Sequence, residues 1–526
     1  MYLAQMLARN AEIYPGNTAL IDVVPSKKWR RQTTWSQLNQ RADRIANALI
    51  DKGVKKGDRV LHLMWNSSYW LEAYFGIIKT GAWAVPLNFR FMSPDIKYCA
   101  NVAEAKAFIV QERFKQRVDA IRSDPELATI EHYIWVSEPG EEKNPLEGWE
   151  NFEELAAKSS AAPVEVELED DDGCALYFTS GTTGKPKPIL LSQLNLEKEA
   201  FATNAYSRYD RSSNELLVAP FYHTGAKMFW FGCLLVGARG TILQEFSPQN
   251  LLETMAREGG TSVFITVPWA IDILNNLERG TLKKENYDLG CWCLTTFGAQ
   301  PVPPDLLKRW GKHFPRHRVA NVYGLSESSG PCCIYLRPED QAKAITGTVG
   351  KVAYGWKAQI VSTEGKDVSI GEVGELLIKG NVMKGYYKNP EGTAEAIENG
   401  WLHTGDIAKM DGEGFIWIVD RAKDVIISGG ENIYPLEVEG VLHKNPKISD
   451  VAVIGYPDER MVEVPVAIVE LKPGESATEE EFMAFCEQNL PKYKRPRKFI
   501  FNKVPRNPTG KIEKPALREK YVGKKS

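Results

Sequence analysis

The feature that most constrains the fold is an alternation of helix-like and strand-like stretches near the start of the chain. Apolar residues recur at helical spacing over residues 38–52, and residues 58–64 read as a strand. A second helical stretch at 69–80 is followed by a second strand at 82–87. Strands separated by helices usually pair in parallel, because the helix carries the chain back across the sheet. The pattern therefore predicts an α/β fold with largely parallel sheets.

The length and a later change of pattern predict two domains. A chain of 526 residues is too long for one ordinary core. Short strands with glycine turns, such as 374–379 and 415–419, precede Asp420–Asp424, and a strand–helix pattern follows over about the last hundred residues. We predict a large domain at 1–422, made of α/β subdomains with a small β-barrel-like part. A small, mobile α+β domain is predicted at 423–526.

Composition limits the class of protein. With 43% hydrophobic and 25% charged residues, the chain is typical of globular rather than disordered proteins. Its net charge is -3, yet residues 491–526 contain 13 Lys and Arg against 2 acidic residues. This basic segment is either an ordinary solvated surface or a small domain that meets polyphosphate. We expect no nucleic-acid partner.

No segment predicts export or membrane insertion. The longest apolar run, at 229–238, is too short to span a bilayer. Residues 1–15 lack a signal-peptide pattern, and the final Gly-Lys-Lys-Ser is not a peroxisomal signal. The eight cysteines show no disulfide framework and no zinc-site spacing, so we expect them to be reduced. These features predict a cytoplasmic protein and leave the oligomeric state, a homodimer included, open.

A loop at residues 179–187 carries the clearest chemical signal. It reads Thr-Ser-Gly-Thr-Thr-Gly-Lys-Pro-Lys, lies between two strand-like stretches, and precedes a helix expected at about 193–206 with Ser192 as its N-cap. Glycine lets backbone N–H groups turn toward an anion, while hydroxyl and lysine side chains add donors and charge. The glycine spacing is not that of a P-loop, and a strand follows in place of a helix. The loop predicts a phosphate site, with a flexible polar hairpin as the alternative. Its candidate ligands are Thr179, Ser180, Gly181, Thr182, Thr183, Gly184 and Lys187.

This loop resembles the signature of the adenylate-forming superfamily: acyl-CoA synthetases, the adenylation domains of peptide synthetases, and luciferases. The resemblance extends over nearly the whole chain, with the motifs in the family's order, and is closest to acyl-CoA synthetases. Pro188 stands where the family loop usually has glycine. The resemblance implies that the loop binds the phosphates of ATP.

Two further stretches resemble the family's adenine and metal site. In Tyr-Gly-Leu-Ser-Glu, at 323–327, the resemblance implies that Tyr323 packs on adenine, Ser326 meets the α-phosphate and Glu327 binds Mg²⁺. A carboxylate oxygen is a ligand that Mg²⁺ prefers. Residues 295–301 should form another wall of the same site. The remaining candidates near adenine are Gly298, Ala299, Gln300, Asn321 and Gly324.

The next two stretches resemble the family's ribose and hinge motifs. Asp406 would hold both ribose hydroxyls, because a carboxylate can accept two hydrogen bonds from a vicinal diol. Arg421 would contact the nucleotide, and Lys423 matches the family's hinge position. In isolation, the Thr-Gly-Asp that ends with Asp406 is typical of a turn.

The remaining motifs supply groups for the two chemical steps. By resemblance, Gly429 and Gly430 would line the pantetheine tunnel of coenzyme A after the small domain rotates, since glycine permits a close approach of backbone to ligand. Lys511 would bridge the carboxylate and the α-phosphate, which favours the transition state of adenylation. His223 would neighbour the bound carboxylate. The alternatives are a structural turn for the glycines and a surface position for Lys511.

The motifs together imply a ligase that adenylates a carboxylic acid with MgATP and then forms an acyl-CoA thioester. Three other functions stay open: loading of a carrier protein, a luciferase-type oxidation, and nucleotide binding by a decayed site. A medium-chain fatty acid or an aryl or alicyclic acid is the expected substrate. This expectation rests on an aromatic neighbourhood that is either an acyl pocket or ordinary core, formed by Phe221, Tyr222, Trp230, Phe231 and Phe297.

Overall fold

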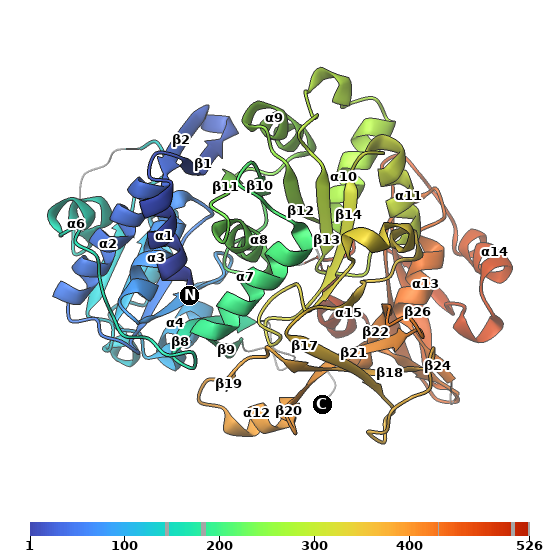
Figure 1. Cartoon of the computed structure of the whole chain (residues 1–526). Coiled ribbons are helices and arrows are strands. Elements are labelled where there is room, and N and C mark those ends of the chain that lie inside the picture. Colours follow the sequence, from blue (N-terminus) through green and yellow to red (C-terminus); the bar gives the residue numbers. More distant parts are fainter. Residues whose placement is uncertain (142–146, 180–185, 430, 507–510, 524–526) are drawn as a thin grey trace.

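The computed structural model describes residues 1–141, 147–179, 186–429, 431–506 and 511–523. Two large sheets with helices packed around them form the N-terminal part, and two smaller sheets follow toward the C-terminus (Figure 1). The helices are α1 (Leu3–Ile13), α2 (Trp35–Asp51), α3 (Ser68–Lys79), α4 (Ser93–Ala103), α5 (Lys115–Asp119), α6 (Phe152–Lys158), α7 (Gln193–Ser207), α8 (Thr224–Leu234), α9 (Pro248–Glu258), α10 (Val267–Glu278), α11 (Pro304–His313), α12 (Pro390–Ala396), α13 (Pro435–Leu442), α14 (Glu479–Asn489) and α15 (Lys514–Tyr521).

The first large sheet has eight strands and carries the phosphate loop near one edge. Its six strands from β8 to β7 pair in parallel, whereas β9 pairs antiparallel to both β8 and β19. In spatial order the strands are β19 (Gly385–Tyr386), β9 (Lys187–Ser192), β8 (Gly173–Thr179), β4 (Trp83–Pro86), β3 (Arg59–Leu63), β5 (Ala107–Gln111), β6 (His132–Val136) and β7 (Glu150–Asn151).

The second large sheet has nine strands, and its middle strands are also parallel. Several of the predicted nucleotide residues, namely Gly298, Asn321 and Tyr323, lie at or near the carboxyl ends of its strands. In spatial order the strands are β16 (Lys351–Val352), β15 (Ile334–Tyr335), β14 (Arg318–Tyr323), β13 (Leu294–Gly298), β12 (Ser262–Thr266), β10 (Asn214–Leu217), β11 (Arg239–Leu243), β1 (Thr18–Val24) and β2 (Trp29–Thr34).

The helical and strand periodicities of the sequence are confirmed. The stretches expected at 38–52 and 69–80 form α2 and α3, and those expected at 58–64 and 82–87 form β3 and β4. The two helices pack together: α2 buries one apolar stripe, which includes Trp35, whereas α3 is buried on all sides. Ser192 caps α7 as expected, since its side chain accepts a hydrogen bond from the N–H of Asn195 at 3.2 Å.

A smaller antiparallel sheet occupies the region where the sequence predicts a β-barrel-like part. Its strands bring the predicted ribose motif opposite the predicted hinge motif, because β21 pairs with β22 in the register Asp406↔Arg421. The strands are β17 (Trp356–Val361), β18 (Val373–Gly380), β21 (Trp401–Met410), β20 (Ile397–Glu398) and β22 (Ile416–Arg421).

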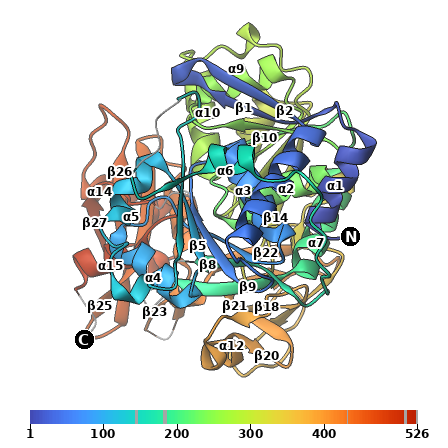
Figure 2. The same cartoon turned by 90° about the vertical axis from the view of Figure 1, so that its left-hand side faces the viewer.

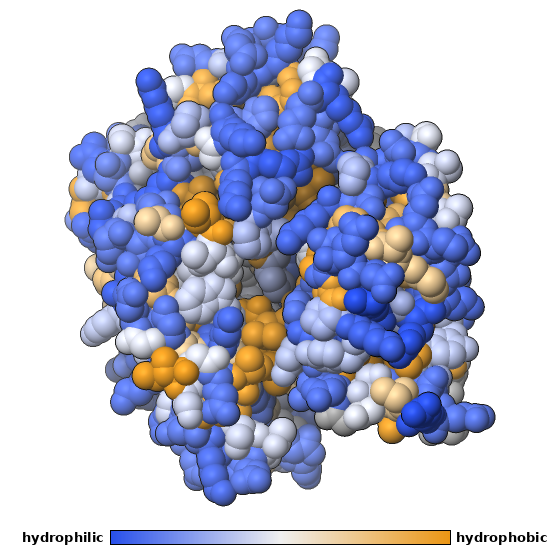
Figure 3. Space-filling model, turned by 90° about the vertical axis from the view of Figure 1, so that its right-hand side faces the viewer, coloured by the Kyte–Doolittle hydropathy of each residue, from blue (hydrophilic) through white to orange (hydrophobic). Residues whose placement is uncertain are grey.

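The C-terminal part is a small α+β unit with its own hydrophobic core, formed by residues such as Ile426, Val453 and Phe482. Figures 1 and 2 both show it gathered on one side of the molecule. The side of the molecule on the right of Figure 1 is hollowed near its centre, with hydrophobic side chains beside the hollow (Figure 3). The predicted boundary at 422/423 falls within the short turn Ala422–Asp424 and stays a prediction. The strands of the unit are β24 (Glu431–Ile433), β23 (Ile426–Ser428), β26 (Val462–Leu471), β25 (Ile448–Asp458) and β27 (Lys498–Phe501).

Candidate active site

The two strands that flank the predicted phosphate loop form an antiparallel hairpin, with Thr179 of β8 opposite Lys187 of β9. Pro188 continues β9 opposite Phe178, so the departure from the family's glycine leaves a regular strand at the loop exit. The Nζ of Lys187 lies 4.8 Å from the ring centroid of Tyr386. Five predicted ligands lie outside the described residues: Ser180, Gly181, Thr182, Thr183 and Gly184.

The predicted magnesium ligand, Glu327, lies against the same tyrosine. The Tyr386 hydroxyl donates to Glu327 Oε1 at 3.1 Å, and the N–H of Met383 donates to the Glu327 carbonyl at 2.7 Å. Tyr386 therefore connects Lys187, at the end of the phosphate loop, with the carboxylate of Glu327. Sequence reasoning missed Tyr386, which is 59 residues from Glu327 and carries no motif of its own.

A second carboxylate is held between an aromatic hydroxyl and a guanidinium group. Tyr323, at the end of β14, donates to Asp406 Oδ2 at 2.6 Å, and Arg421 Nε lies 3.0 Å from Asp406 Oδ1. Burial and the neighbouring carboxylate raise the pKa of Tyr323 well above its usual value, so its hydroxyl stays a donor. Asp406 is only 3% exposed, which fixes its two oxygens in place.

Asn321 presents an unused hydrogen-bond acceptor in the adenine region. Its Nδ2 donates to the Thr348 carbonyl at 2.8 Å, whereas its buried Oδ1 has no partner among the described residues. A buried acceptor without a donor costs free energy, so a ligand amine there would be favourable. The exocyclic amine of adenine fits this requirement.

The adjacent loop after β13 contains a strained residue and a tightly packed glycine. Ala299 has a φ of 68°, which is unusual for a residue with a Cβ and is typical of functional sites. A Cβ on Gly298 would come within 2.9 Å of Val322 Cγ2. The loop is therefore held close to β14, beside Asn321.

Ser326 and His223 approach each other from different elements. The hydroxyl of Ser326 lies 3.1 Å from that of Thr224, the first residue of α8, and His223 precedes it as N-cap. The Nε2 of His223 is buried and has no hydrogen-bond partner within the part of the chain that the structure describes. Burial, together with Lys511 and Lys227, lowers the pKa of His223 to about 3, so the imidazole is neutral at physiological pH.

Lys511 of the small domain reaches this same region. Burial and the nearby Arg421 guanidinium lower the pKa of Lys511 to about 8, against the opposing effect of Asp406 and Glu327. These electrostatic interactions place the amine among the residues that come from the nucleotide motifs. The structure thus brings Lys511, from the last motif, near Glu327 and Asp406 and also near His223, which lies 288 residues earlier in the sequence.

Two contacts fix how the small domain meets the large one. Arg506 binds the Asp450 carboxylate at 2.6 and 2.7 Å and donates to Gln300 Oε1 at 3.1 Å. The N–H of Leu436 donates to Asp420 Oδ2 at 2.9 Å. Arg506 lies five residues before Lys511, so its contact with Gln300 helps to position the lysine.

The predicted glycine loop is turned toward its own domain. Gly429 has a φ of 58°, and its N–H donates to the Met461 carbonyl at 2.8 Å. Its predicted neighbour Gly430 lies outside the described residues. The predicted hinge residue Lys423 is close enough to Lys511 to lower the pKa of that lysine. Burial and the charge of Arg421 in turn lower the pKa of Lys423.

Three of the aromatic residues considered for an acyl pocket belong to the hydrophobic core. Trp230 stacks on Trp35 with ring centroids 5.9 Å apart, and Phe297 meets Trp310 at 5.2 Å. Trp230, Phe231 and Phe297 are fully buried, at 0% exposure. For these three side chains, core packing is the correct interpretation.

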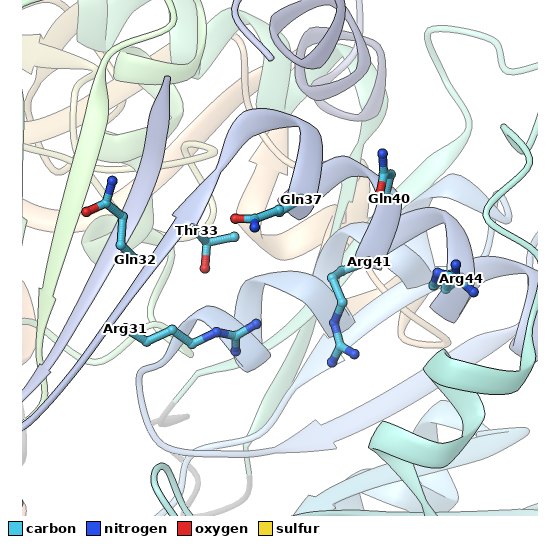
Figure 4. Close-up of a pocket in the computed structure, with 7 residues that line it drawn as sticks. All are labelled: Arg31, Gln32, Thr33, Gln37, Gln40, Arg41 and Arg44. Atoms are coloured by element: carbon cyan, nitrogen blue, oxygen red, sulfur yellow. The ribbon is translucent and has the colours of Figure 1, made fainter. Parts of the chain in front are cut away.

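A polar pocket of about 270 Å³ lies elsewhere, between β2 and α2 (Figure 4). Its arginines are already engaged: Arg31 and Arg41 both bind Glu72 at 2.8 Å, and Arg41 also binds Glu153 at 2.7 Å. We assign it no part in the site. It is lined by Arg31, Gln32, Thr33, Gln37, Gln40, Arg41 and Arg44.

Three structural features are absent from the described residues. All eight cysteines lie within those ranges, and none of them forms a disulfide. Across those ranges no group of three or more His, Cys, Asp or Glu side chains forms a ready metal site. No helix in the described part of the chain has the length and apolar character to cross a membrane.

Comparison with known proteins gives matches over the whole chain. A family described as "AMP-binding enzyme" matches residues 7–387, and its C-terminal domain matches residues 437–511. A long-chain fatty acid–CoA ligase of Mycobacterium tuberculosis is 33% identical over 523 residues, covering 98% of each chain. A feruloyl-CoA synthase of Amycolatopsis is 34% identical, covering 93% of this chain and 94% of that protein.

Solved structures show the same fold. The anthranilate–CoA ligase in complex with anthranoyl-AMP superposes with a TM-score of 0.87 at 27% identity, covering 99% of this chain and 97% of that one. The o-succinylbenzoate–CoA synthetase of Bacillus subtilis, in complex with ATP and a magnesium ion, gives a TM-score of 0.82 at 26% identity, covering 98% and 99%.

Proposed function

This chain belongs to the family of AMP-binding enzymes, and from that premise we propose that it is an AMP-forming carboxylate–CoA ligase. The observation that carries the proposal is the convergence of Lys511 with Glu327 and Asp406. A cation there could offset the charge of the reacting anions, while the two carboxylates could hold Mg²⁺ and the ribose hydroxyls. The relatives that match over almost the full length are also named CoA ligases and synthetases.

In the first step, a carboxylate oxygen of the acid attacks the α-phosphorus of ATP, and the bond to the β-phosphate oxygen breaks to release pyrophosphate. Lys511 lies between the two reacting anions and offsets their repulsion. Glu327 would hold Mg²⁺, which neutralises phosphate charge when bound. No protein nucleophile is needed, because the substrate carboxylate is itself the nucleophile.

The nucleotide is held by side chains whose positions are fixed in advance. Asn321 Oδ1 would accept from the adenine amine, and Asp406 would accept from the ribose hydroxyls beside its contacts with Tyr323 and Arg421. Lys187 would meet the phosphates. Fixed donors and acceptors reduce the reorganisation that the transition state requires.

In the second step, the thiol of coenzyme A attacks the acyl carbon of the acyl-adenylate and loses its proton to solvent. A carbon–sulfur bond forms, and the bond between the acyl carbon and the phosphate oxygen of AMP breaks, so that AMP leaves. We propose that the domain after residue 422 rotates about Lys423 between the steps and brings Gly429 and Gly430 to the acyl group. Lys511 then leaves the site with its domain. Hinges at element ends commonly serve this kind of motion.

For the acid, we propose a medium-chain fatty acid or an aryl or alicyclic acid. Tyr222 and His223 supply a partly aromatic wall beside Ser326, and their rings lie 4.3 Å apart. Similar proteins are named for ferulate, indoleacetate and long-chain fatty acids. These acids are apolar and mostly aromatic, and none of those three names describes an amino acid.

The test is pyrophosphate release with MgATP across a panel of carboxylic acids, with and without coenzyme A. Release with one class of acid, and fast turnover to AMP only with coenzyme A, is expected. Adenylation that ignores coenzyme A would favour a carrier protein as acceptor. If the protein binds MgATP but releases no pyrophosphate with any acid of the panel, a decayed site would be favoured.

A further inference from the structure

Lys227, in the first turn of α8, is a buried cationic residue outside the motifs. Its exposure is 0%, and no Asp or Glu forms an ion pair with it anywhere in the described ranges. Lysine is rarely buried completely without a carboxylate partner, because an ammonium group is costly to desolvate. Burial lowers its pKa well below the usual value. The N–H groups of such a buried residue need hydrogen-bond partners within the protein.

The N–H groups of Lys227 bind the turn that carries His223. Its Nζ donates to the carbonyls of Phe221 and His223, both at 3.2 Å. The same Nζ lies 4.2 Å from the ring centroid of Tyr177, in the strand that leads into the phosphate loop. Lys227 thus joins the His223 turn to the strand before the loop.

A second buried side chain holds the other polar groups of that turn. Asn66, which is 3% exposed, accepts from the N–H of Phe221 at 2.8 Å and donates to the Ala219 carbonyl at 2.8 Å. The backbone from Ala219 to His223 lies between β10 and α8, outside both elements. Two backbone bonds also hold this turn: the His223 N–H donates to the Pro220 carbonyl at 3.1 Å, and the Ala226 N–H donates to the His223 carbonyl at 3.4 Å. Since no ladder supports this backbone, Asn66 and Lys227 add the side-chain hydrogen bonds that fix it.

We propose that Lys227 is a positioning residue, which fixes the turn at 220–223 in the shape that receives the carboxylic acid substrate. The inference rests on the proposed function, since that function places the acid beside His223. The turn also presents the buried Tyr222 hydroxyl next to His223 Nε2, and neither group has a hydrogen-bond partner among the described residues. Both groups face a site only if the turn keeps its conformation.

The alternative is that Lys227 contributes to stability alone. Loss of its two hydrogen bonds would then lower the melting temperature and leave the substrate constants unchanged. A positioning role predicts instead a selective effect on the acid, because the adenine and ribose groups, Asn321 and Asp406, do not contact the turn through any bond in the described residues. The two roles therefore differ in the ratio of the two KM values.

The decisive experiment uses Lys227→Met, which keeps the length of the side chain and removes its donors. Lys198→Met, at an exposed position of α7, is the matched control. Pyrophosphate release is measured against acid concentration at saturating MgATP, and against MgATP at saturating acid. We expect the KM for the acid to rise about tenfold, which corresponds to the loss of one to two net hydrogen bonds, and the KM for MgATP to change by less than about twofold.

The outcomes separate this inference from the proposed function. An active wild-type enzyme with unchanged KM values in Lys227→Met, or with both KM values raised together, would overturn the positioning role alone. A wild-type enzyme that releases no pyrophosphate with any acid would overturn the proposed function. If Lys227→Met does not fold, Asn66→Ala and Lys227→Gln test the same turn, and the same selective rise in the KM for the acid is expected.

Discussion

The amine of Lys511 is expected to set the alkaline limit of adenylation. An ordinary lysine titrates near pH 10.5, but burial and the Arg421 guanidinium lower the pKa of Lys511 to about 8 in the free enzyme. The protonated form is the one that can offset the charge of the carboxylate and the α-phosphate. Adenylation should therefore be maximal below pH 8 and should fall as the pH rises through this value.

The size of the effect follows from the pKa. At pH 7, one unit below it, about nine-tenths of Lys511 is protonated, and at pH 9 about one-tenth is. The kcat/KM for adenylation, which reports the free enzyme, should thus fall about tenfold between these values. The decline in kcat should lie at higher pH, because the phosphates of bound ATP favour the ammonium form. The Tyr323 hydroxyl does not interfere, since its pKa is raised well above its usual value.

The assay is pyrophosphate release without coenzyme A, so that ionisation of the thiol does not contribute. The control is Lys511→Arg, whose guanidinium stays protonated throughout the range. This variant should be slower at every pH, and its decline near pH 8 should disappear. A wild-type profile that is flat to pH 10, or a variant that keeps the same decline, would refute the assignment of the pKa to Lys511.

Three substitutions test other parts of the site. Gly324→Ala should lower the free energy of unfolding by about 1–3 kcal/mol in chemical denaturation, because the new Cβ would come 1.9 Å from the Gly330 carbonyl oxygen. Gly311→Ala is the control: its Cβ meets nothing within 4 Å, so the change should be neutral or slightly stabilising. Asp406→Asn should raise the KM for MgATP about tenfold or more with little change in the KM for the acid, since charged hydrogen bonds contribute about 1.5–3 kcal/mol; an unchanged KM for MgATP would contradict a role in ribose binding. Glu327→Gln should raise the Mg²⁺ concentration needed for half-maximal pyrophosphate release roughly tenfold, and an unaltered Mg²⁺ dependence would exclude this carboxylate as a ligand.

The fold was largely predictable because its signals are local. The amphipathic spacing in residues 35–51 and the apolar strands beside it determine α2 and β3 without reference to the rest of the chain. The same holds for the hairpin around the phosphate loop, whose strands and following N-cap, Ser192, appear as expected. The family match confirms the recognition that these local motifs suggested.

The contacts that complete the site could not be predicted, because they join residues far apart in the sequence. Tyr386 reaches Glu327 only because β19 pairs with β9 at the sheet edge. The contact of Arg506 with Gln300 spans 206 residues and depends on how two domains meet. Lys227 lies in a largely apolar helix and belongs to none of the motifs. Only its hydrogen bonds to backbone carbonyls distinguish it from the apolar side chains packed around it.

The position of the small domain itself indicates which step the structure represents. Lys511 is among the nucleotide residues, and Arg506, five residues earlier, is bound to Gln300 of the large domain. Gly429, from the same small domain, is bonded instead to Met461 of that domain. A rigid domain that presents Lys511 to the site cannot present the glycine loop in the same place at the same time. Under the proposed function, this arrangement suits attack on ATP, and the rotation proposed for attack by a thiol should break the Arg506–Gln300 contact.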